Sequence, residues 1–100
     1  MEKYVLKDNA ERKRYEFDTD GLVKPHIDYI KNNQAVIYLT HTEVPQPLQG
    51  RGVGQALVKG VLEDVEKQGL RVVPTCPFVA AYMKRNPATQ RLLMPGVNVG

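Results

Sequence analysis

The stretch Pro47-Leu-Gln-Gly-Arg-Gly-Val-Gly-Gln-Ala-Leu-Val58 places three glycines at alternate positions directly before a periodic apolar pattern. Gly50, Gly52 and Gly54 allow sharp backbone turns that leave main-chain amides exposed. The residues that follow predict an amphipathic helix, and the first turn of a helix offers unpaired N–H groups and the positive end of its dipole. The stretch is therefore predicted to hold an anion, most naturally a phosphate group.

The elements around this loop predict a β-α-β unit. Apolar residues recur at helical spacing after the loop, and these are Leu57, Val58, Val61, Leu62 and Val65. Gly69 marks the expected end of the helix, and Gly60 is expected to permit close packing. Before the loop, Ala35–Leu39 predicts a central strand covered on both faces, with a polar end at Thr40–Glu43. Leu70–Val73 predicts a strand that a right-handed crossover places parallel to it.

The first third of the chain predicts three shorter strands. Tyr4–Leu6 is a candidate first strand, followed by a turn over Asn9–Glu11. An alternating strand is expected from Arg12, with Tyr15 and Phe17 on one face. A hairpin turn at Asp20–Gly21 then leads into a return strand over Val23–Tyr29.

The last quarter of the chain is predicted to be mostly helical. Pro74 cannot donate to a strand ladder, so pairing should end there and leave Cys76 at the opening. A helix is expected over Phe78–Arg85, ended by Asn86–Pro87, with a brief helical turn over Ala88–Met94.

The bulk composition predicts one domain over residues 1–100, with 42% hydrophobic and 25% charged residues. One cysteine excludes an internal disulfide, and no apolar run approaches the roughly 20 residues of a membrane span, so a cytoplasmic protein is expected. A net charge of +3 is too mild to indicate a nucleic-acid binder, and the basic run Arg12–Arg14 would be divided between two strand faces. One cysteine and two histidines give no metal-ligand spacing.

The glycine loop fails two phosphate-binding templates. No Lys-Ser or Lys-Thr pair exists for a Walker loop, and Gly50-Arg-Gly52-Val-Gly54 lacks the spacing of the dinucleotide fingerprint. The stretch Gln49-Gly-Arg-Gly-Val-Gly54 does fit Gln/Arg-x-x-Gly-x-Gly/Ala, and with the order of elements around it the chain resembles the GNAT acetyltransferase superfamily. More narrowly, His41-Thr-Glu-Val-Pro45 and Cys76 followed by an aromatic and a helix resemble its very small members.

The resemblance implies an α/β fold: a mixed, mostly antiparallel sheet with a β-α-β acetyl-CoA-binding unit and a C-terminal helix. Loop amides would hold the coenzyme A pyrophosphate, and the pantetheine arm would lie where the two parallel strands part. The cofactor-binding residues implied are Val44, Gln49, Gly50, Arg51, Gly52, Val53, Gly54, Gln55, Cys76, Tyr82, Lys84 and Arg85. The expected activity is transfer of acetyl from acetyl-CoA to an unidentified amine, by a monomer or homodimer. The alternative is a non-catalytic acyl-CoA-binding or partner-binding module.

The chain departs from the full family pattern in the parts that normally wall the acceptor site. Two helices usually separate the first two strands, whereas only Asn9–Glu11 are available here. A closing strand pair is usual at the C-terminus, whereas residues 77–100 read as mostly helical. The acceptor half of the site is therefore expected to be open or borrowed from a partner.

Four residues are candidates for the chemistry that the resemblance implies. Glu43 would be the base that deprotonates the amine, unless it is a solvated carboxylate. His41 shares its face in an extended strand and is an alternative base or a structural residue. Cys76 would accept the acetyl group, line the cofactor site or simply pack as a small apolar group. Tyr82 would protonate the leaving thiolate or pack as an aromatic residue.

Overall fold

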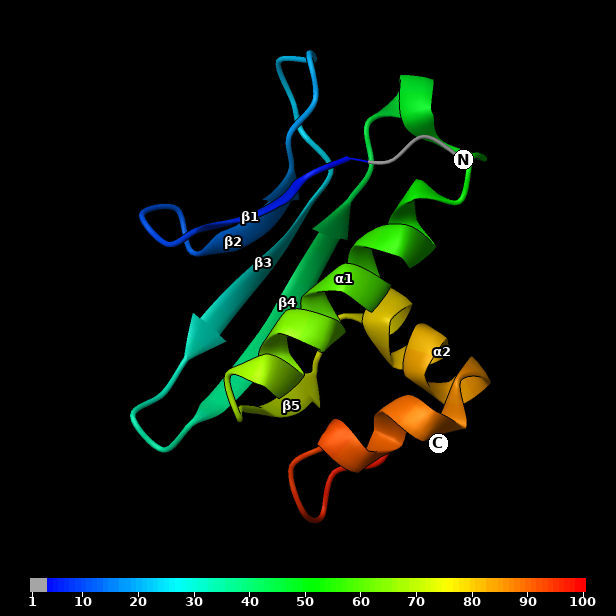
Figure 1. Cartoon of the computed structure of the whole chain (residues 1–100). Helices are drawn as coiled ribbons and strands as arrows, with labels where there is room; N and C mark the ends of the chain where they lie inside the picture. The colour runs from blue at the N-terminus through cyan, green and yellow to red at the C-terminus, as the bar shows by residue number, and fades with distance from the viewer. Residues whose placement is uncertain (1–3) are drawn as a thin grey trace.

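The computed structural model describes residues 4–100 and shows a five-stranded sheet with the strand order β1-β2-β3-β4-β5 (Figure 1). Neighbouring strands pair antiparallel except β4 and β5, which are parallel. The strands are β1 (Leu6–Asn9), β2 (Arg14–Phe17), β3 (His26–Lys31), β4 (Val36–Glu43) and β5 (Arg71–Pro74). The helices are α1 (Val53–Lys67) and α2 (Pro77–Arg85), with 3-10 turns η1 (Gln46–Leu48) and η2 (Pro87–Leu92). This confirms the predicted mixed, mostly antiparallel fold with a β-α-β unit.

Helix α1 packs its predicted apolar stripe against the sheet. All five stripe residues are buried, and they join one core with Tyr15, Phe17, Ile27, Leu39 and Val72 from the strands. Gly69 follows the helix with φ of 71°, a left-handed conformation that favours glycine and ends the helix where predicted. A Cβ on Gly60 would lie 3.2 Å from Leu6 Cδ2, so the prediction of close packing at Gly60 is confirmed.

Strand β4 contains a bulge that reverses the side-chain alternation towards its end. Leu39 pairs with Tyr29 and His41 pairs with Asp28, so Thr40 is an extra residue on β4. Before the bulge, Leu39 faces α1. After it, Thr42 faces α1 beside Ile27, and His41 and Glu43 point to the opposite face.

The N-terminal strands begin later than the sequence predicted. The first strand is Leu6–Asn9 rather than Tyr4–Leu6, and the turn falls at residues 10–13, because Lys13 adopts a left-handed φ of 56° and β2 starts only at Arg14. The predicted tight turn at Asp20–Gly21 is part of a longer loop, and β3 starts at His26.

The predictions for the second half of the chain agree more closely with the structure. Strand β5 is parallel to β4, and its last ladder pair joins Pro74 to Leu39, which confirms that pairing ends at the proline. Helix α2 and the following 3-10 turn lie within a few residues of their predicted positions. The prediction that β4 is buried on both of its faces is not confirmed. Tyr38 and Thr40, on the face away from α1, are only half-buried.

Two buried tyrosines of the sheet donate hydrogen bonds to carboxylates on neighbouring elements. Tyr15 donates a hydrogen bond of 2.6 Å to Asp64 on α1, and Gln68 donates to the Tyr15 hydroxyl at 3.2 Å. Tyr29 donates to Asp8 on β1 at 2.5 Å. The pKa values of Tyr15 and Tyr29 are raised above the ordinary tyrosine value. Burial is the larger cause, and the adjacent carboxylate is the second. Both phenols therefore remain protonated hydrogen-bond donors.

The C-terminal segment covers the outer edge of β5. Leu93 forms a parallel bridge to Val72, and the Met94 N–H donates to the Val72 carbonyl at 2.9 Å. Arg91 contacts both carboxylate oxygens of Glu66 on α1, at 2.8 and 2.7 Å. Within residues 4–100, no helix is long and apolar enough to cross a membrane.

Candidate functional site

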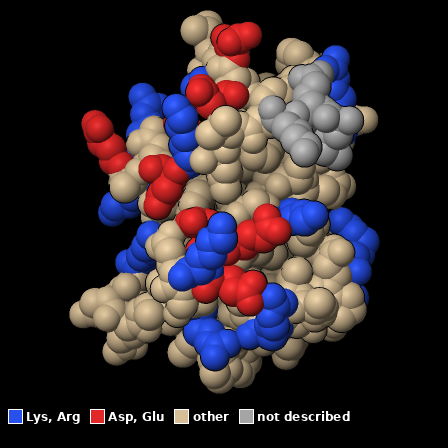
Figure 2. Space-filling view, in the orientation of Figure 1, with Lys and Arg blue, Asp and Glu red and all other residues tan. Residues whose placement is uncertain are grey.

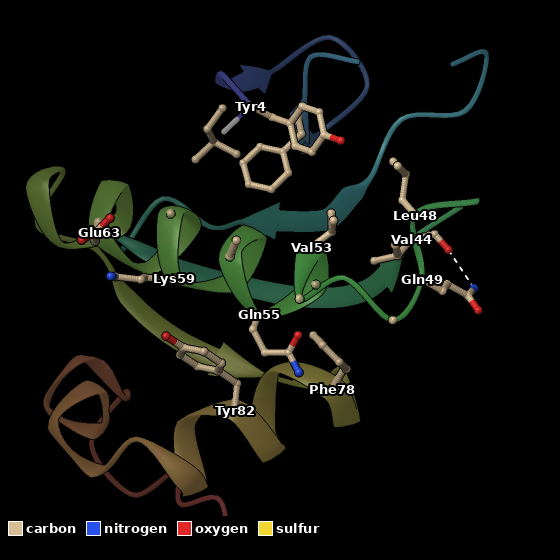
Figure 3. Close-up of a pocket in the computed structure, with 17 residues that line it drawn as sticks. Tyr4, Val44, Leu48, Gln49, Val53, Gln55, Lys59, Glu63, Phe78 and Tyr82 are labelled. Carbon is tan, nitrogen blue, oxygen red and sulfur yellow. Dashed lines mark hydrogen bonds between the residues drawn. The ribbon is translucent and has the colours of Figure 1, made fainter. Parts of the chain in front are cut away.

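The glycine loop joins the end of β4 to the start of α1. Gly50 and Gly52 adopt left-handed φ values of 78° and 75°, which favour glycine at both positions. The Gln49 side chain donates from Nε2 to the Val44 carbonyl at 2.9 Å and so fastens the loop to the strand end (Figure 3). Glycine backbone geometry and the Gln49 side-chain hydrogen bond therefore both stabilise the loop conformation.

The first turn of α1 is arranged to receive an anion. Gly52 is the N-cap residue and supplies no side-chain cap, and no acidic residue lies in the first turn. The first intrahelical bond runs from the Ala56 N–H to the Gly52 carbonyl, at 3.1 Å, so the preceding amides have no intrahelical acceptor. Together with the positive end of the helix dipole, these amides favour a phosphate group.

A cavity of about 1020 Å³ opens over this loop and the first half of α1 (Figure 3). Eight of the predicted cofactor-binding residues line it: Val44, Gln49, Gly50, Gly52, Val53, Gly54, Gln55 and Tyr82. The other four lie outside it. Arg51 is exposed within the loop, Lys84 and Arg85 are exposed in the last turn of α2, and Cys76 is buried.

Charged side chains at the cavity lie on α1 rather than at the end of α2. Lys59 and Glu63 line the cavity, and they follow Gln55 at helical spacing of four residues. In the face shown in Figure 2, acidic and basic side chains are interspersed rather than separated into single-sign patches. Among the cavity-lining residues that the structure describes, Lys59 is the one cation available to an anionic ligand.

Tyr82 projects from α2 towards the cavity (Figure 3). Burial, and after it the carboxylate of Glu63, raises the pKa of Tyr82 above the ordinary tyrosine value. The phenol therefore keeps its proton at neutral pH and can donate a hydrogen bond to a bound ligand. The raised pKa also makes it a weaker acid than an ordinary tyrosine.

Cys76 does not line the cavity and is the N-cap residue of α2, at the point where β4 and β5 part. The residue is 4% exposed, its N–H donates to the Leu39 carbonyl at 2.9 Å, and its Sγ lies 3.3 Å from the Thr42 hydroxyl oxygen. Since Thr42 faces α1, the thiol also lies on the α1 side of the sheet. Its immediate polar neighbour is a hydroxyl group, not a base.

His41 and Glu43 lie on the opposite face of the sheet from Cys76. His41 Nε2 is 3.1 Å from Glu43 Oε1, and the two side chains are 59% and 51% exposed. The structure thus brings the two candidate bases together but does not bring either onto the face of the candidate nucleophile. The bulge at Thr40 is the reason, because it turns both side chains away from α1.

Comparison with known proteins identifies the family. Residues 14–92 match the family described as GCN5-related N-acetyl-transferase. The chain belongs to the GCN5-related N-acetyl-transferase family. In line with this, it is 39% identical over 57 residues to Protein NATD1 of Gallus gallus and of Homo sapiens. The matched segment is 57% of this chain but only 52% and 50% of those two proteins, so the similarity spans about half of each relative.

A solved structure shares the fold of this family member over almost its whole length. It is the solution structure of a GCN5-like protein from Staphylococcus aureus, with a TM-score of 0.70 and 23% sequence identity. The alignment covers 94% of this chain and 91% of the other. An acetyltransferase-like fold is therefore established for the chain.

Several cavity residues were not anticipated from the sequence. Lys59 could have been found, because it lies one helical turn after Gln55 on the polar side of α1. Phe78 follows Cys76 closely, but its contact with α1 depends on how α2 is docked. Leu6 and Phe17 reach the cavity from the first two strands and Tyr4 from the segment just before β1, and only the tertiary fold places these segments beside α1. Among residues 4–100, no group of three or more His, Cys, Asp or Glu side chains is arranged to hold a metal ion.

Proposed function

We propose that the protein binds acetyl-CoA and transfers its acetyl group to an amine. The observation that carries this proposal is the anion site at the start of α1, where two left-handed glycines and uncapped helix amides face a large cavity. The family supports the same cofactor, because GCN5-related N-acetyltransferases are named for acetyl transfer.

The residues of the cavity fit the parts of the coenzyme. The amides of the Gln49–Gly54 loop and of the first turn of α1 would hold the pyrophosphate, and Lys59 would add a positive charge at the next turn. Gln55 and Tyr82 offer hydrogen-bonding groups on the α2 side of α1. Arg51 lies in the loop and would contact phosphate from outside the cavity. Lys84 and Arg85 do not line the cavity, so the proposal gives them no contact with the coenzyme.

The bound coenzyme supplies an activated thioester, so the protein's share of the work is positioning and proton transfer. In our proposal the acyl end reaches the opening between β4 and β5 from the α1 side, and the amine approaches from the face of His41 and Glu43. His41 would accept the ammonium proton at Nδ1, while its Nε2–H donates to the Glu43 carboxylate at 3.1 Å and so stabilises the resulting imidazolium. Tyr82 would donate a hydrogen bond or a proton towards the departing thiolate.

Direct transfer fits the geometry better than a route through Cys76. A covalent route needs a base to take the thiol proton, and the group in contact with Sγ is the Thr42 hydroxyl. The two candidate bases point away on the other face. We therefore place Cys76 as a buried residue at the inner end of the strand opening.

Calorimetry with acetyl-CoA, desulfo-CoA and ATP tests the cofactor assignment. We expect both coenzymes to bind and ATP to bind more weakly. Lys59→Ala should weaken coenzyme binding, while Lys67→Ala, which removes the same charge two turns further along α1, should not. No binding of either coenzyme refutes the proposal.

An acceptor screen separates an enzyme from a coenzyme-binding module. Primary amines are incubated with acetyl-CoA and protein, and acetylated products are measured by mass spectrometry. We expect His41→Ala and Glu43→Gln to lower turnover while leaving coenzyme affinity unchanged. Intact mass after acetyl-CoA alone decides the covalent route: an acetyl adduct that disappears in Cys76→Ala would contradict direct transfer.

A further inference from the structure

We call the region between the cavity and Cys76 the passage, and two residue pairs at the end of β4 and the start of α2 define its inner and outer levels. At the inner level, Thr42 of β4 and Cys76 at the start of α2 meet through the hydroxyl and the thiol, 3.3 Å apart. The outer level lies two residues further along both segments, at Val44 and Phe78. Val44 follows the end of β4, and its Cγ2 would lie 3.5 Å from a Cβ built on Gly54, so its side chain is on the α1 side, as is that of Thr42.

Val44 and Phe78 close over the first turn of α1. A Cβ built on Gly54 would lie 2.7 Å from Phe78 Cζ and 3.5 Å from Val44 Cγ2. The aromatic ring thus rests on the helix backbone at a position where any larger residue would collide with it. Figure 3 shows Phe78 extending from α2 towards this turn.

The cavity ends at this outer level. Val44 and Phe78 both line the cavity, whereas Cys76 does not and is 4% exposed. Val44 and Phe78 are thus the members of these two pairs that belong to the cavity wall. Phe78 is itself only half-buried and is the second residue of α2, so its ring lies at the edge of the packed core beside the cavity.

We propose that Phe78 is the specificity-determining residue of the donor site: its ring closes the passage against Val44 and limits which acyl groups reach the strand opening. The inference rests on the proposed function, since it takes the cavity to be the coenzyme site. A two-carbon acyl group would pass when the ring turns aside, and a longer chain would be excluded by the ring. The same closure shields the Cys76 thiol from solvent and from thiol-reactive molecules.

The single cysteine of the chain allows a direct test of the closure. Native protein is incubated with iodoacetamide, and labelling of Cys76 is followed by intact mass. We expect Phe78→Ala to raise the labelling rate at least about tenfold, because the outer cover of the thiol is lost. The labelling rate of Phe78→Leu, which keeps part of the side-chain volume, should fall between those of wild type and Phe78→Ala. Equal rates in wild type and Phe78→Ala would overturn the closure.

A matched variant excludes general loosening of the fold. Tyr38→Ala truncates a half-buried aromatic residue on the opposite face of the sheet, next to β5. We expect its labelling rate to remain within about threefold of wild type. An increase as large as that of Phe78→Ala would overturn the specific role of Phe78.

The selectivity for the acyl group is tested by calorimetry with acetyl-CoA and hexanoyl-CoA. Wild type should bind acetyl-CoA more tightly, and Phe78→Ala should lose most of that preference. An unchanged preference would overturn the role in specificity. If no coenzyme binds but labelling still depends on Phe78, the proposed function fails and the closure stands. If coenzyme binds and labelling is unchanged, the closure fails alone.

Discussion

The bond between Tyr15 and Asp64 gives a stability prediction with a defined pH dependence. Tyr15 is 1% exposed and donates to the carboxylate at 2.6 Å, joining β2 to α1. Hydrogen bonds to charged groups contribute about 1.5–3 kcal/mol, and Gln68 also donates to Asp64 and remains in its place. We therefore expect Tyr15→Phe to lower the free energy of unfolding at pH 7 by about 2 kcal/mol.

The loss in free energy of unfolding caused by Tyr15→Phe should be smaller at alkaline pH. Because the pKa of Tyr15 is raised in the folded state, the native protein keeps the phenol proton while the unfolded chain loses it near pH 10. The stabilisation is complete below about pH 10 and is lost as the pH rises towards the folded pKa. Phenylalanine has no such proton, so the difference between wild type and Tyr15→Phe should fall by about 1.4 kcal/mol between pH 9 and pH 11.

Urea unfolding followed by circular dichroism at pH 7, 9, 10 and 11 measures both effects. Taking the difference between the two proteins cancels the titration of groups that they share. Tyr38→Phe is the control, because the Tyr38 hydroxyl makes no hydrogen bond among the residues that the structure describes. A pH-independent difference for Tyr15→Phe would refute the argument that burial and Asp64 hold the proton in the native state.

Three further substitutions test the loop, the core and the C-terminal segment. Gly52→Ala forces alanine into a φ of 75°, so it should cost about 1–3 kcal/mol in urea unfolding and weaken coenzyme binding in calorimetry. Leu57→Ala empties a fully buried position and should lower stability by about 2–5 kcal/mol in the same assay. Arg91→Ala removes the half-exposed pair with Glu66, so it should cost less than about 1 kcal/mol but speed hydrogen exchange at the Met94 amide.

The sequence was most informative where local chemistry and periodicity decide the structure. Glycines at alternate positions followed by a helical apolar stripe are local features, and they predicted the loop, α1 and its end at Gly69. The parallel placement of β5 followed from the handedness of crossover connections. The N-terminal strands were predicted less well, because short strands at a sheet edge depend on turn conformations such as that of Lys13.

The arrangement of the catalytic candidates shows the limit of sequence patterns. Counting alternate residues from the buried Ile37 and Leu39 would place His41 and Glu43 on the α1 face, beside Cys76. The extra residue at the bulge reverses that order, and nothing in the residue types of β4 marks its position. A bulge forms where two strands fit best together, so its location is a property of the assembled sheet.

The sequence by itself determined the glycine loop, the helix that follows it and the resemblance that named the family, because each depends on neighbours in the chain. The tertiary structure decided which residues share a space. Docking of α2 brought Phe78 onto Gly54, the first two strands brought Leu6 and Phe17 to the cavity, and the bulge separated His41 and Glu43 from Cys76. These are contacts between distant segments, and their energies depend on packing that no local pattern records.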